Sequence, residues 1–526
     1  MKMKMMAGMM LAALGLFASC SKTEKDVVDP NQEGSTYVGI TLSMGTNDLR
    51  ANEDDNYSKK GTWNGKDEIK TIDVYVVDVA SNVVSTGFYN KNNFTIEQAD
   101  GAPSIKITPK TAIRTTPGTK RVYALVNASA EVTRVLANAD ATVFENTYNK
   151  VAQGFAIATL AKHENGKDVI MASNAKICTV DVEKGVTEAE ALDAASSKNR
   201  AKVEMKRVVA RVLVTTTQET YEVMYSDGTT KMGTVKDISY AGAQGEKKFF
   251  IGQQLTTDGK IYTPAYAYIP TRPEDIWGAE GKDSYDYSDL KEHTFTNNPR
   301  MAKAINAPLS VEQIGEESLV KSLFMYEASH KYQSDPSNTD PDFSKYDGGF
   351  RRGNTPYVLV RARFVPDAGA FADGTTDYQE GQDFYLGANN KFYSKLAHVT
   401  DPAKGGVAGQ KFRHYVEGKV LYYAFVNPDR PLNTLDAPVF RNNIYHINIK
   451  GFKTIGTNWN PLFPEDPDNP NPSGPENPDP RPDDDPTDNP NPFNPEDPNT
   501  PKETWMSVEM SVLAWTVHSY DIELSL

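Results

Sequence analysis

The sequence predicts a mainly β protein in which two β-sandwich domains follow one another. Short runs of β-branched and aromatic residues recur along the chain, separated by loops that carry Gly, Pro, Asn and Asp, a pattern typical of sandwiches. Helix signals are fewer, chiefly capping boxes that begin at Thr187 and Ser310. The 526 residues exceed the usual size of one domain, so we expect more than one core.

The first twenty residues predict export. Lys2 and Lys4 precede an apolar run that ends at Ser19, and this run is too short to span a bilayer, as is typical of a secretory signal. Small residues directly before Cys20 match a bacterial lipobox, so residues 1–20 are a predicted lipoprotein signal peptide and Cys20 is the predicted lipidation site. Acyl chains on Cys20 would tether the exported protein to a membrane. An ordinary cleaved signal is the alternative.

A strictly alternating segment follows, and a polar loop comes directly after it. The alternation predicts a half-buried strand with an apolar face formed by Val38, Ile40, Leu42 and Met44. In the loop, Arg50 offers a trypsin-like protease an exposed cut site before Ala51, so residues 21–50 form a predicted propeptide. A cut there would free the whole strand and leave a groove with an apolar floor and unpaired backbone edges.

The body of the chain divides into a predicted N-terminal domain at 51–205 and a C-terminal domain at 206–460. The boundary is placed after a polar, Ala-rich helix expected at 187–200. Predicted strands lie at 71–77, 104–107 and 121–126 in the first domain, and at 208–215, 357–364, 419–425 and 443–449 in the second.

The composition changes abruptly at residues 461–502. This segment holds 15 of the 32 prolines and eleven acidic against two basic residues, which is −9 of the net charge of −14. Its few apolar residues cannot offset the entropy lost on ordering, so we expect a disordered, self-repelling spacer rich in Pro, Asp and Asn. At about 3.1 Å per residue such a spacer could reach on the order of 130 Å.

The last segment, 503–526, returns to a strand pattern. Its apolar residues alternate with polar ones and then continue after a shift of register, through Met506, Val508, Met510, Val512, Trp515 and Val517. A hydrophobic strand at the end of a tether must pair in a sheet, either in its own domain or as a strand donated to another molecule. If each copy loses its first strand and donates its last, head-to-tail contacts that do not close produce a filament.

The sequence carries no constellation typical of catalysis. It has no phosphate loop, dinucleotide fingerprint, paired-His helix or Cys-x-x-Cys, and its seven histidines never stand at metal-ligand spacing. We therefore expect no catalytic residue, no metal site, no cofactor and no enzyme activity. The net charge of −14 argues against nucleic acid as a partner, because phosphate backbones repel an acidic protein. Cys178 is expected to be a small buried residue in a strand, although its role is not defined by the sequence.

Several segments together resemble the fimbrillin, or type V pilin, family, and in particular the shaft subunits of the short, or minor, fimbriae of periodontal anaerobes. Beside the lipobox and the strand that ends near Arg50, they are VEMKRVVARV at 203–212, RGNTPYVLVRA at 352–362, VAG at 407–409, GKVLYYA at 418–424, RNNIYHI at 441–447, MSVE at 506–509 and WTVHSY at 515–520. The resemblance covers essentially the whole chain. No single motif would carry it.

The resemblance implies two tandem transthyretin-like β-sandwich domains with a few short helices, followed by the spacer and a C-terminal donor strand. It further implies an outer-membrane lipoprotein precursor that an Arg-specific cysteine protease matures. By matching positions, Cys20 corresponds to the acylated cysteine and Arg50-Ala51 to the maturation site, while the donor region falls within 503–526. The implied partners are copies of the same chain, anchor and tip accessory subunits, and receptors on host or bacterial surfaces, in adhesion and biofilm formation.

A monomeric surface lipoprotein that binds glycans or host proteins is the competing interpretation. Such a protein needs a flexible spacer after Cys20 and no terminal strand. Here the long spacer instead precedes the last strand, where a polymerising subunit needs reach. This order favours the filament.

Overall fold

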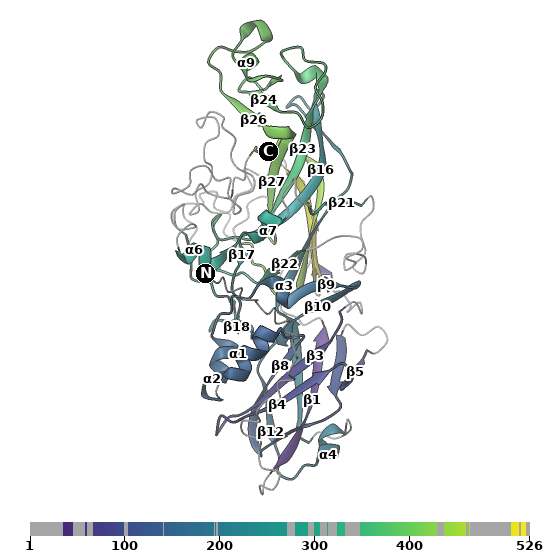
Figure 1. Ribbon diagram of the computed structural model, residues 1–526, viewed down its shortest axis with the longest axis vertical. Coiled ribbons are helices and arrows are strands. Elements are labelled where there is room, and N and C mark those ends of the chain that lie inside the picture. The colour runs from purple at the N-terminus through teal and green to yellow at the C-terminus, as the bar shows by residue number, and fades with distance from the viewer. Residues whose placement is uncertain are drawn as a thin grey trace, which may run out of the picture.

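The computed structural model is elongated (Figure 1). It describes residues 35–45, 58–59, 67–98, 104–139, 141–193, 195, 198–270, 279–292, 299–305, 313, 323–331, 348–428, 436–458, 462, 506–514 and 517–521. One end is built from the N-terminal strands, the middle from a second set of sheets, and the far end from a small sheet near helix α9 (Leu396–Val399).

A ten-stranded sheet forms the N-terminal end. It runs in the order β4-β3-β8-β11-β13-β1-β6-β5, with β12 paired to β8 and β7 paired to β1. Its strands are β1 (Thr36–Gly45), β3 (Thr71–Asp78), β4 (Val84–Asn90), β5 (Phe94–Glu97), β6 (Ser104–Pro109), β7 (Ile113–Thr115), β8 (Gly118–Val126), β11 (Ala172–Asn174), β12 (Cys178–Val182) and β13 (Arg200–Arg207).

This sheet encloses one hydrophobic core, because several of its strands contribute to the same buried cluster. Val74 and Val76 of β3, Ile107 of β6 and Val203 of β13 meet there with the apolar face of β1. The alternation that predicted strands at 71–77, 104–107 and 121–126 is confirmed by β3, β6 and β8. Burial of alternate side chains against a shared core is what fixes these strands in place.

Short helices cover the opposite side of β3 and β8. Helices α1 (Ala130–Asn138) and α2 (Ala141–Asn149) lie side by side in Figure 1, and Phe144 and Tyr148 of α2 pack against Tyr75 and Tyr123. Near the junction follow α3 (Ile157–Leu160) and the hairpin of β9 (Ala161–Glu164) with β10 (Lys167–Ile170).

Helix α4 (Glu188–Leu192) carries the predicted capping box. The Thr187 hydroxyl accepts from Glu190 N at 3.3 Å, and the Glu190 carboxylate accepts from Thr187 N at 2.9 Å. The helix ends at Leu192 and is therefore much shorter than the helix that the composition predicted at 187–200. Ser310 lies outside the described residues.

Two sheets pack face to face in the C-terminal half. The first runs β2-β30-β29-β28-β14-β21 with β22 also paired to β14, and the second runs β15-β16-β23-β27. Their strands are β2 (Ser58–Lys59), β14 (Val209–Thr216), β21 (Lys303–Ala304), β22 (Leu323–Tyr326), β28 (Asn443–Phe452), β29 (Met506–Ala514) and β30 (Val517–Asp521), then β15 (Tyr221–Met224), β16 (Lys231–Ala243), β23 (Tyr357–Pro366) and β27 (Lys419–Phe425). The core between them joins Val212 and Val214 to Val358, Val360 and Tyr422.

Smaller elements complete this half. They are the sheet of β24 (Phe384–Gly387), β25 (Phe392–Tyr393) and β26 (Phe412–Tyr415), the pairs β17 (Gly245–Glu246) with β20 (Tyr285–Asp286) and β18 (Gln254–Leu255) with β19 (Ile261–Tyr262), helices α6 (Ala279–Ser284) and α7 (Ser288–Glu292), and the 3₁₀ turns η3 (Ala368–Ala370), η4 (Pro402–Lys404) and η5 (Val416–Gly418). In the described part of the chain, no helix has the length and apolar character needed to cross a membrane.

The fold class predicted from the sequence is confirmed: the protein is mainly β with a few short helices. The chain passes from one sheet to the other at Val208, between the end of β13 and the start of β14, a little beyond the boundary expected at 205. Strand β2 lies in the segment assigned to the first domain, yet it pairs in the C-terminal sheet. Leu462 is fully buried, so the packed structure includes this residue of the segment assigned to the spacer. The rest of 461–502 lies outside the described residues.

Candidate functional site: strand β1 and its surroundings

Strand β1 occupies the middle of the N-terminal sheet. Along one edge it runs parallel to β13, with Ile40 opposite Ala201 and Leu42 opposite Val203. Along its other edge it runs antiparallel to β6 and then to β7. A strand with partners on both edges is integral to the sheet, and its loss would leave two rows of unpaired backbone groups.

The apolar face of β1 is buried as its alternation predicted. Val38, Ile40, Leu42 and Met44 are each at most 2% exposed, and all four belong to the core of the N-terminal sheet. Burying four side chains of this size contributes roughly 6–12 kcal/mol. The core of this half is therefore incomplete without the strand.

The other face of β1 corrects the prediction of a half-buried strand. Gly39 is buried and Thr41 is 9% exposed, whereas Ser43 is exposed. The cover comes from α4: the carbonyl oxygen of Ala191 lies so close that a Cβ built on Gly39 would be 2.0 Å from it. Only a glycine permits this approach.

Arg200, the first residue of β13, links α4 to β1. Its Nη2 donates to the carbonyl oxygens of Ala191 at 3.0 Å and Asp193 at 2.8 Å. Its Nη1 donates to the Thr41 hydroxyl at 3.3 Å. One guanidinium thus holds the end of the helix and the strand together.

A second network holds the start of β1. The Asn199 amide nitrogen donates to the Thr36 hydroxyl at 3.1 Å and to Tyr37 O at 2.9 Å. The Thr36 hydroxyl in turn donates to Glu183 O at 2.7 Å, and Gly39 N donates to Asn199 O at 2.8 Å. Glu183 and Asn199 therefore hold the start of β1 in place through main-chain and side-chain hydrogen bonds.

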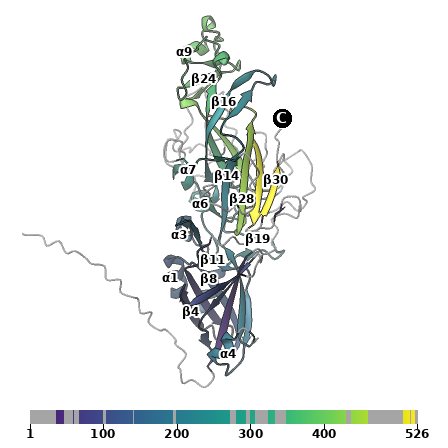
Figure 2. The same cartoon turned by 90° about the vertical axis from the view of Figure 1, so that its right-hand side faces the viewer.

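The C-terminal strand lies in its own chain's C-terminal sheet. Strand β29 pairs antiparallel with β28, with Tyr445 opposite Val512 and Ile449 opposite Val508. Strand β30 then folds back on β29, and β2 pairs with both. Figure 2 shows β29 and β30, in yellow, beside β28. The sequence left open whether this strand pairs in its own domain or in another molecule, and in the isolated chain it pairs in its own domain.

The remaining predicted site residues lie outside the described residues. They are Cys20, Arg50, Ala51 and Trp515. For Met506, Val508, Met510, Val512 and Val517 the structure gives strand positions and partners. The lipidation site, the cut and the donor role stay predictions.

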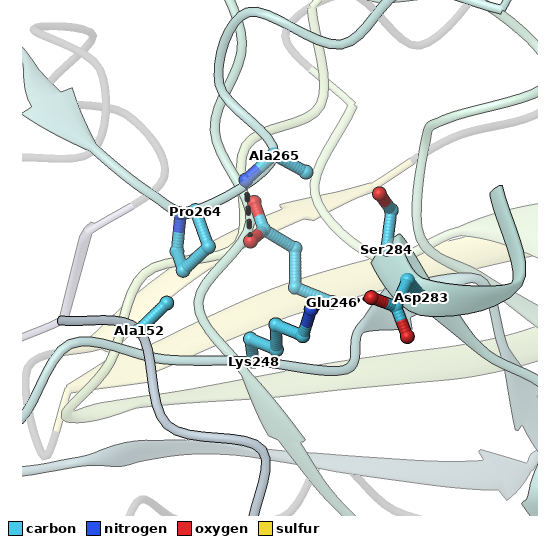
Figure 3. Close-up of a pocket in the computed structure, with 7 residues that line it drawn as sticks. All are labelled: Ala152, Glu246, Lys248, Pro264, Ala265, Asp283 and Ser284. Carbon is cyan, nitrogen blue, oxygen red and sulfur yellow. Dashed lines mark hydrogen bonds and ion pairs between the residues drawn. The ribbon is translucent and has the colours of Figure 1, made fainter. Parts of the chain in front are cut away.

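A cavity of about 460 Å³ opens beside β17, far from β1 in the sequence. In Figure 3 the Glu246 carboxylate lies against the backbone N–H of Ala265, which donates to it at 3.0 Å, while Lys248 pairs with Asp283 at 2.8 Å. Burial raises the pKa of Glu246 well above its usual value. The described lining contains neither His nor Cys, and its carboxylates are already held by Ala265 N and by Lys248, so no described lining residue is arranged as a nucleophile with its base.

The other described titratable side chains form no metal or catalytic site. Among the residues that the structure describes, no group of three or more His, Cys, Asp or Glu side chains could hold a metal ion. Cys178 is half-buried, and burial raises the pKa of its thiol. A thiol of this kind is a poor nucleophile.

Sequence reasoning missed Gly39, Ala191, Asn199 and Arg200 as residues of this site. A glycine inside an alternating strand is a signal of close backbone approach and could have identified Gly39. Nothing in the sequence connects Gly39 with α4, because their contact joins residues about 150 positions apart.

Comparisons with known proteins agree with the resemblance drawn from the motifs. The model of the family "Major fimbrial subunit protein type IV, Fimbrillin, C-terminal" matches residues 413–521. The minor fimbrium subunit Mfa1 of Porphyromonas gingivalis is 32% identical over 549 residues, a match that covers 98% of each chain.

Solved structures are less similar. The tip fimbrial protein Mfa3 of Porphyromonas gingivalis, with a C-terminal truncation, is 10% identical with a TM-score of 0.33, and the match covers 79% of this chain and 95% of that one. A fimbrial assembly protein of Parabacteroides distasonis is 10% identical with a TM-score of 0.27, covering 79% and 91%.

Proposed function

The chain belongs to the fimbrillin family, that of the minor fimbrium subunit Mfa1, and from this we propose that it is the structural shaft subunit of a cell-surface fimbrium. Its role is structural and not enzymatic. It is exported as an outer-membrane lipoprotein precursor through Cys20, activated by an Arg-specific cysteine protease, and polymerised by strand exchange. The filament supports adhesion and biofilm formation.

The position of β1 carries this proposal. The strand fills the centre of a sheet and buries four apolar side chains, yet it lies in a segment that one cut would detach. Its removal exposes a groove with an apolar floor and unpaired backbone groups along both edges. A β-strand with one apolar face can fill such a groove, so a second strand is needed to restore the core. A subunit with this vacancy and a spare strand polymerises head to tail.

The position of Arg50 supports cleavage there. It is the only basic residue between β1 and β2, in the segment 46–57. The next arginines along the chain lie in secondary structure: Arg114 is in β7, Arg121 in β8 and Arg134 in α1. Arg121 also pairs with Glu145 at 2.6 Å. Proteases need accessible backbone that can be drawn out of regular structure, which argues against cleavage at these three.

The C-terminal strand must leave its own sheet to enter a neighbour. In the isolated chain β29 and β30 satisfy β28, so the unpolymerised subunit protects its own edge. When the C-terminal strand moves to a neighbouring subunit, it loses its pairing with β28 and gains pairing in the groove. Its apolar side chains then bury the core surface that β1 covered before cleavage. We expect the copies to be joined by residues 503–526, with anchor and tip subunits as further partners at the two ends and receptors on host or bacterial surfaces.

The pairing of β29 within its own chain also favours the alternative of a monomeric surface lipoprotein that binds glycans or host proteins. The alternative leaves the loop at Arg50 and the 42-residue spacer without a purpose. Polymerisation distinguishes the two directly.

Truncation after residue 502 tests the donor role. We expect a folded, exported protein that forms no filaments, because residues 1–502 retain both cores apart from the C-terminal hairpin. Electron microscopy of cells and circular dichroism of the purified chain measure the two properties. Filaments of normal length from the truncated chain would contradict strand donation.

Substitution of the cut site tests activation. Arg50→Ala should leave the protein as unpolymerised precursor, while Arg134→Ala, a control within α1, should mature normally. N-terminal sequencing of subunits recovered from filaments should give Ala51 as the first residue. A different first residue would move the cut, and filaments built from uncleaved chains would refute activation by proteolysis.

A further inference from the structure

The contact between Gly39 and Ala191 restricts what can occupy the place of β1. A Cβ at position 39 would lie 2.0 Å from Ala191 O and 2.9 Å from Ala191 C, distances that real Cβ atoms do not show. These atoms belong to the backbone of α4 and cannot turn aside as a side chain could. Any incoming residue other than glycine at this position therefore requires α4 to move.

Arg200 stands next to the neighbouring outward position, 41. The described residues offer it no ion-pair partner: its Nη atoms donate to two carbonyl oxygens and the Thr41 hydroxyl. Its Nε is buried and has no acceptor. A guanidinium with an unused N–H can donate two parallel, charge-assisted hydrogen bonds to one carboxylate, and these are stronger than bonds to neutral oxygens.

The C-terminal strand matches β1 residue for residue in its apolar pattern. Both contain four apolar residues at every second position: Val38, Ile40, Leu42 and Met44 in β1, and Met506, Val508, Met510 and Val512 in the C-terminal strand. If the four align, the three intervening residues fall on positions 39, 41 and 43. Glu509 is the middle one, so it takes position 41 whichever way the strand runs.

The alignment also places a serine at position 39, either Ser507 or Ser511 according to direction. Residues 503–526 contain no glycine, so no register of this segment satisfies the contact with α4 as it stands. In this register the carboxylate of Glu509 lies near Arg200, and the Cβ of the serine at position 39 clashes with Ala191 O.

We infer that the C-terminal strand of a second copy enters the groove in this register, with Glu509 paired to Arg200 and with α4 displaced from the sheet. The inference rests on the proposed strand exchange. As Arg200 turns to the carboxylate it gives up the carbonyls of Ala191 and Asp193, which frees the end of α4 to move away from the serine. The ion pair between Glu509 and Arg200 fixes the register of the donated strand. Helix α4 packs closely on the chain's own β1, which has a glycine at position 39, but must move away from a donated strand, which has a serine there.

A charge swap in the full-length chain tests the pair. Arg200→Glu and Glu509→Arg should each slow polymerisation of the cleaved protein by roughly tenfold or more, since each removes the ion pair and places like charges together. The double variant should recover most of the rate. Light scattering after cleavage measures it, and circular dichroism checks that each variant is folded. Lys202→Glu, an exposed residue of the same strand, should not rescue Glu509→Arg. Equal rates for all variants, or no recovery in the double variant, would overturn the register.

Synthetic peptides of residues 503–526 test the contact with α4 on unaltered protein. The full chain is cleaved after Arg50 and mixed with the native peptide or with Ser507→Gly or Ser511→Gly peptides. We expect one glycine peptide to bind about tenfold more tightly than the native peptide, because α4 can then close, and its identity gives the direction of the strand.

Hydrogen exchange supplies the independent readout. Amides of 186–193 should lose protection in the complex with the native peptide and regain it with the favoured glycine peptide. Equal affinities with unchanged protection would overturn the role of α4 and leave strand exchange intact. Failure of every peptide to bind, the native one included, would refute strand exchange itself and the inference with it.

Discussion

His330 is a fully buried histidine in the C-terminal half. Its Nε2 lies 3.1 Å from the carbonyl oxygen of Asn354, and its ring stands edge-on to Phe350 with centroids 5.2 Å apart. Its Nδ1 has no hydrogen-bond partner. Burial lowers the pKa of this imidazole from 6.5 to about 4, because the charged form would lose its hydration.

This environment predicts a loss of stability in acid. Between pH 6.5 and about 4 the unfolded chain binds a proton that the folded chain does not, so the free energy of unfolding falls as the pH falls through that window. The full loss is roughly 3 kcal/mol at about 1.4 kcal/mol per pH unit. Urea unfolding at pH 7 and pH 4.5 should show the loss in the native protein, and a folded His330→Gln variant should show less of it.

The native protein measured at both pH values is the reference for the variant. An equal pH dependence in the native and His330→Gln proteins would contradict the assignment to His330.

At the scale of single elements, the proposed cleavage implies that β1 stabilises the precursor but not the mature subunit. Leu42→Ala removes a fully buried side chain and should lower the free energy of unfolding of the precursor by about 2–5 kcal/mol. After cleavage and replacement of β1, the same substitution should have no effect on the filament. Denaturant unfolding of precursor and filament measures both. Exposed Ser43 is the matched control, and Ser43→Ala should be neutral in both forms. An equal loss in the filament would mean that β1 remains in place after cleavage.

The sequence predicted strands well where β-branched and aromatic residues form a continuous run. Strands β3, β8, β23, β27 and β28 all lie in such runs. A run of this kind is a local property of the sequence. Strands β2 and β21 are only two residues long, too short to form such a run, and they were not predicted.

Long-range contacts explain what could not be predicted in the site. The alternation of β1 indicated its inner face, but the cover over Gly39 comes from α4, which follows β1 in the sequence only after eight further strands of the same sheet. Likewise, the pattern at 506–512 predicts a strand without naming its partner. Apolar alternation is satisfied equally by β28 of the same chain and by a vacated groove in another.

At the scale of the whole molecule, the two parts of the proposed assembly site lie in different halves. Strand β1 and α4 are at the N-terminal end, whereas β29 and β30 lie beside β28 in the C-terminal half (Figures 1 and 2). A groove and a donor so separated suit head-to-tail contact between copies better than exchange within one chain. The spacer predicted before the donor strand, at about 3.1 Å per residue, would be long enough for the transfer.

The junction between the halves is both apolar and charged. One hydrophobic cluster joins Phe144 and Tyr148 of the N-terminal half to Phe249 and Ile444 of the C-terminal half. One buried ion pair crosses the junction, Arg211 with Asp168, while the buried pairs Arg207 with Asp67 and Arg441 with Glu327 each lie within one half. Arg207 also donates to Asn442 at 3.1 Å. The shared core and the polar contacts across it couple the two halves at the junction.

The pair of Arg211 and Asp168 gives a direct test of this coupling, because it joins β14 of one half to β10 of the other at 3.2 Å. Arg211→Met leaves the Asp168 carboxylate buried without its guanidinium, which costs about 3–5 kcal/mol, whereas removing both charges in Arg211→Met with Asp168→Leu is much less costly. We expect calorimetry to show one main transition for the native protein and two for the single variant, since the halves then unfold separately, with one transition restored in the double variant. Lys231→Met, which breaks an exposed pair with Glu222, should change nothing. A single variant that still unfolds in one transition would mean that the apolar cluster alone couples the halves.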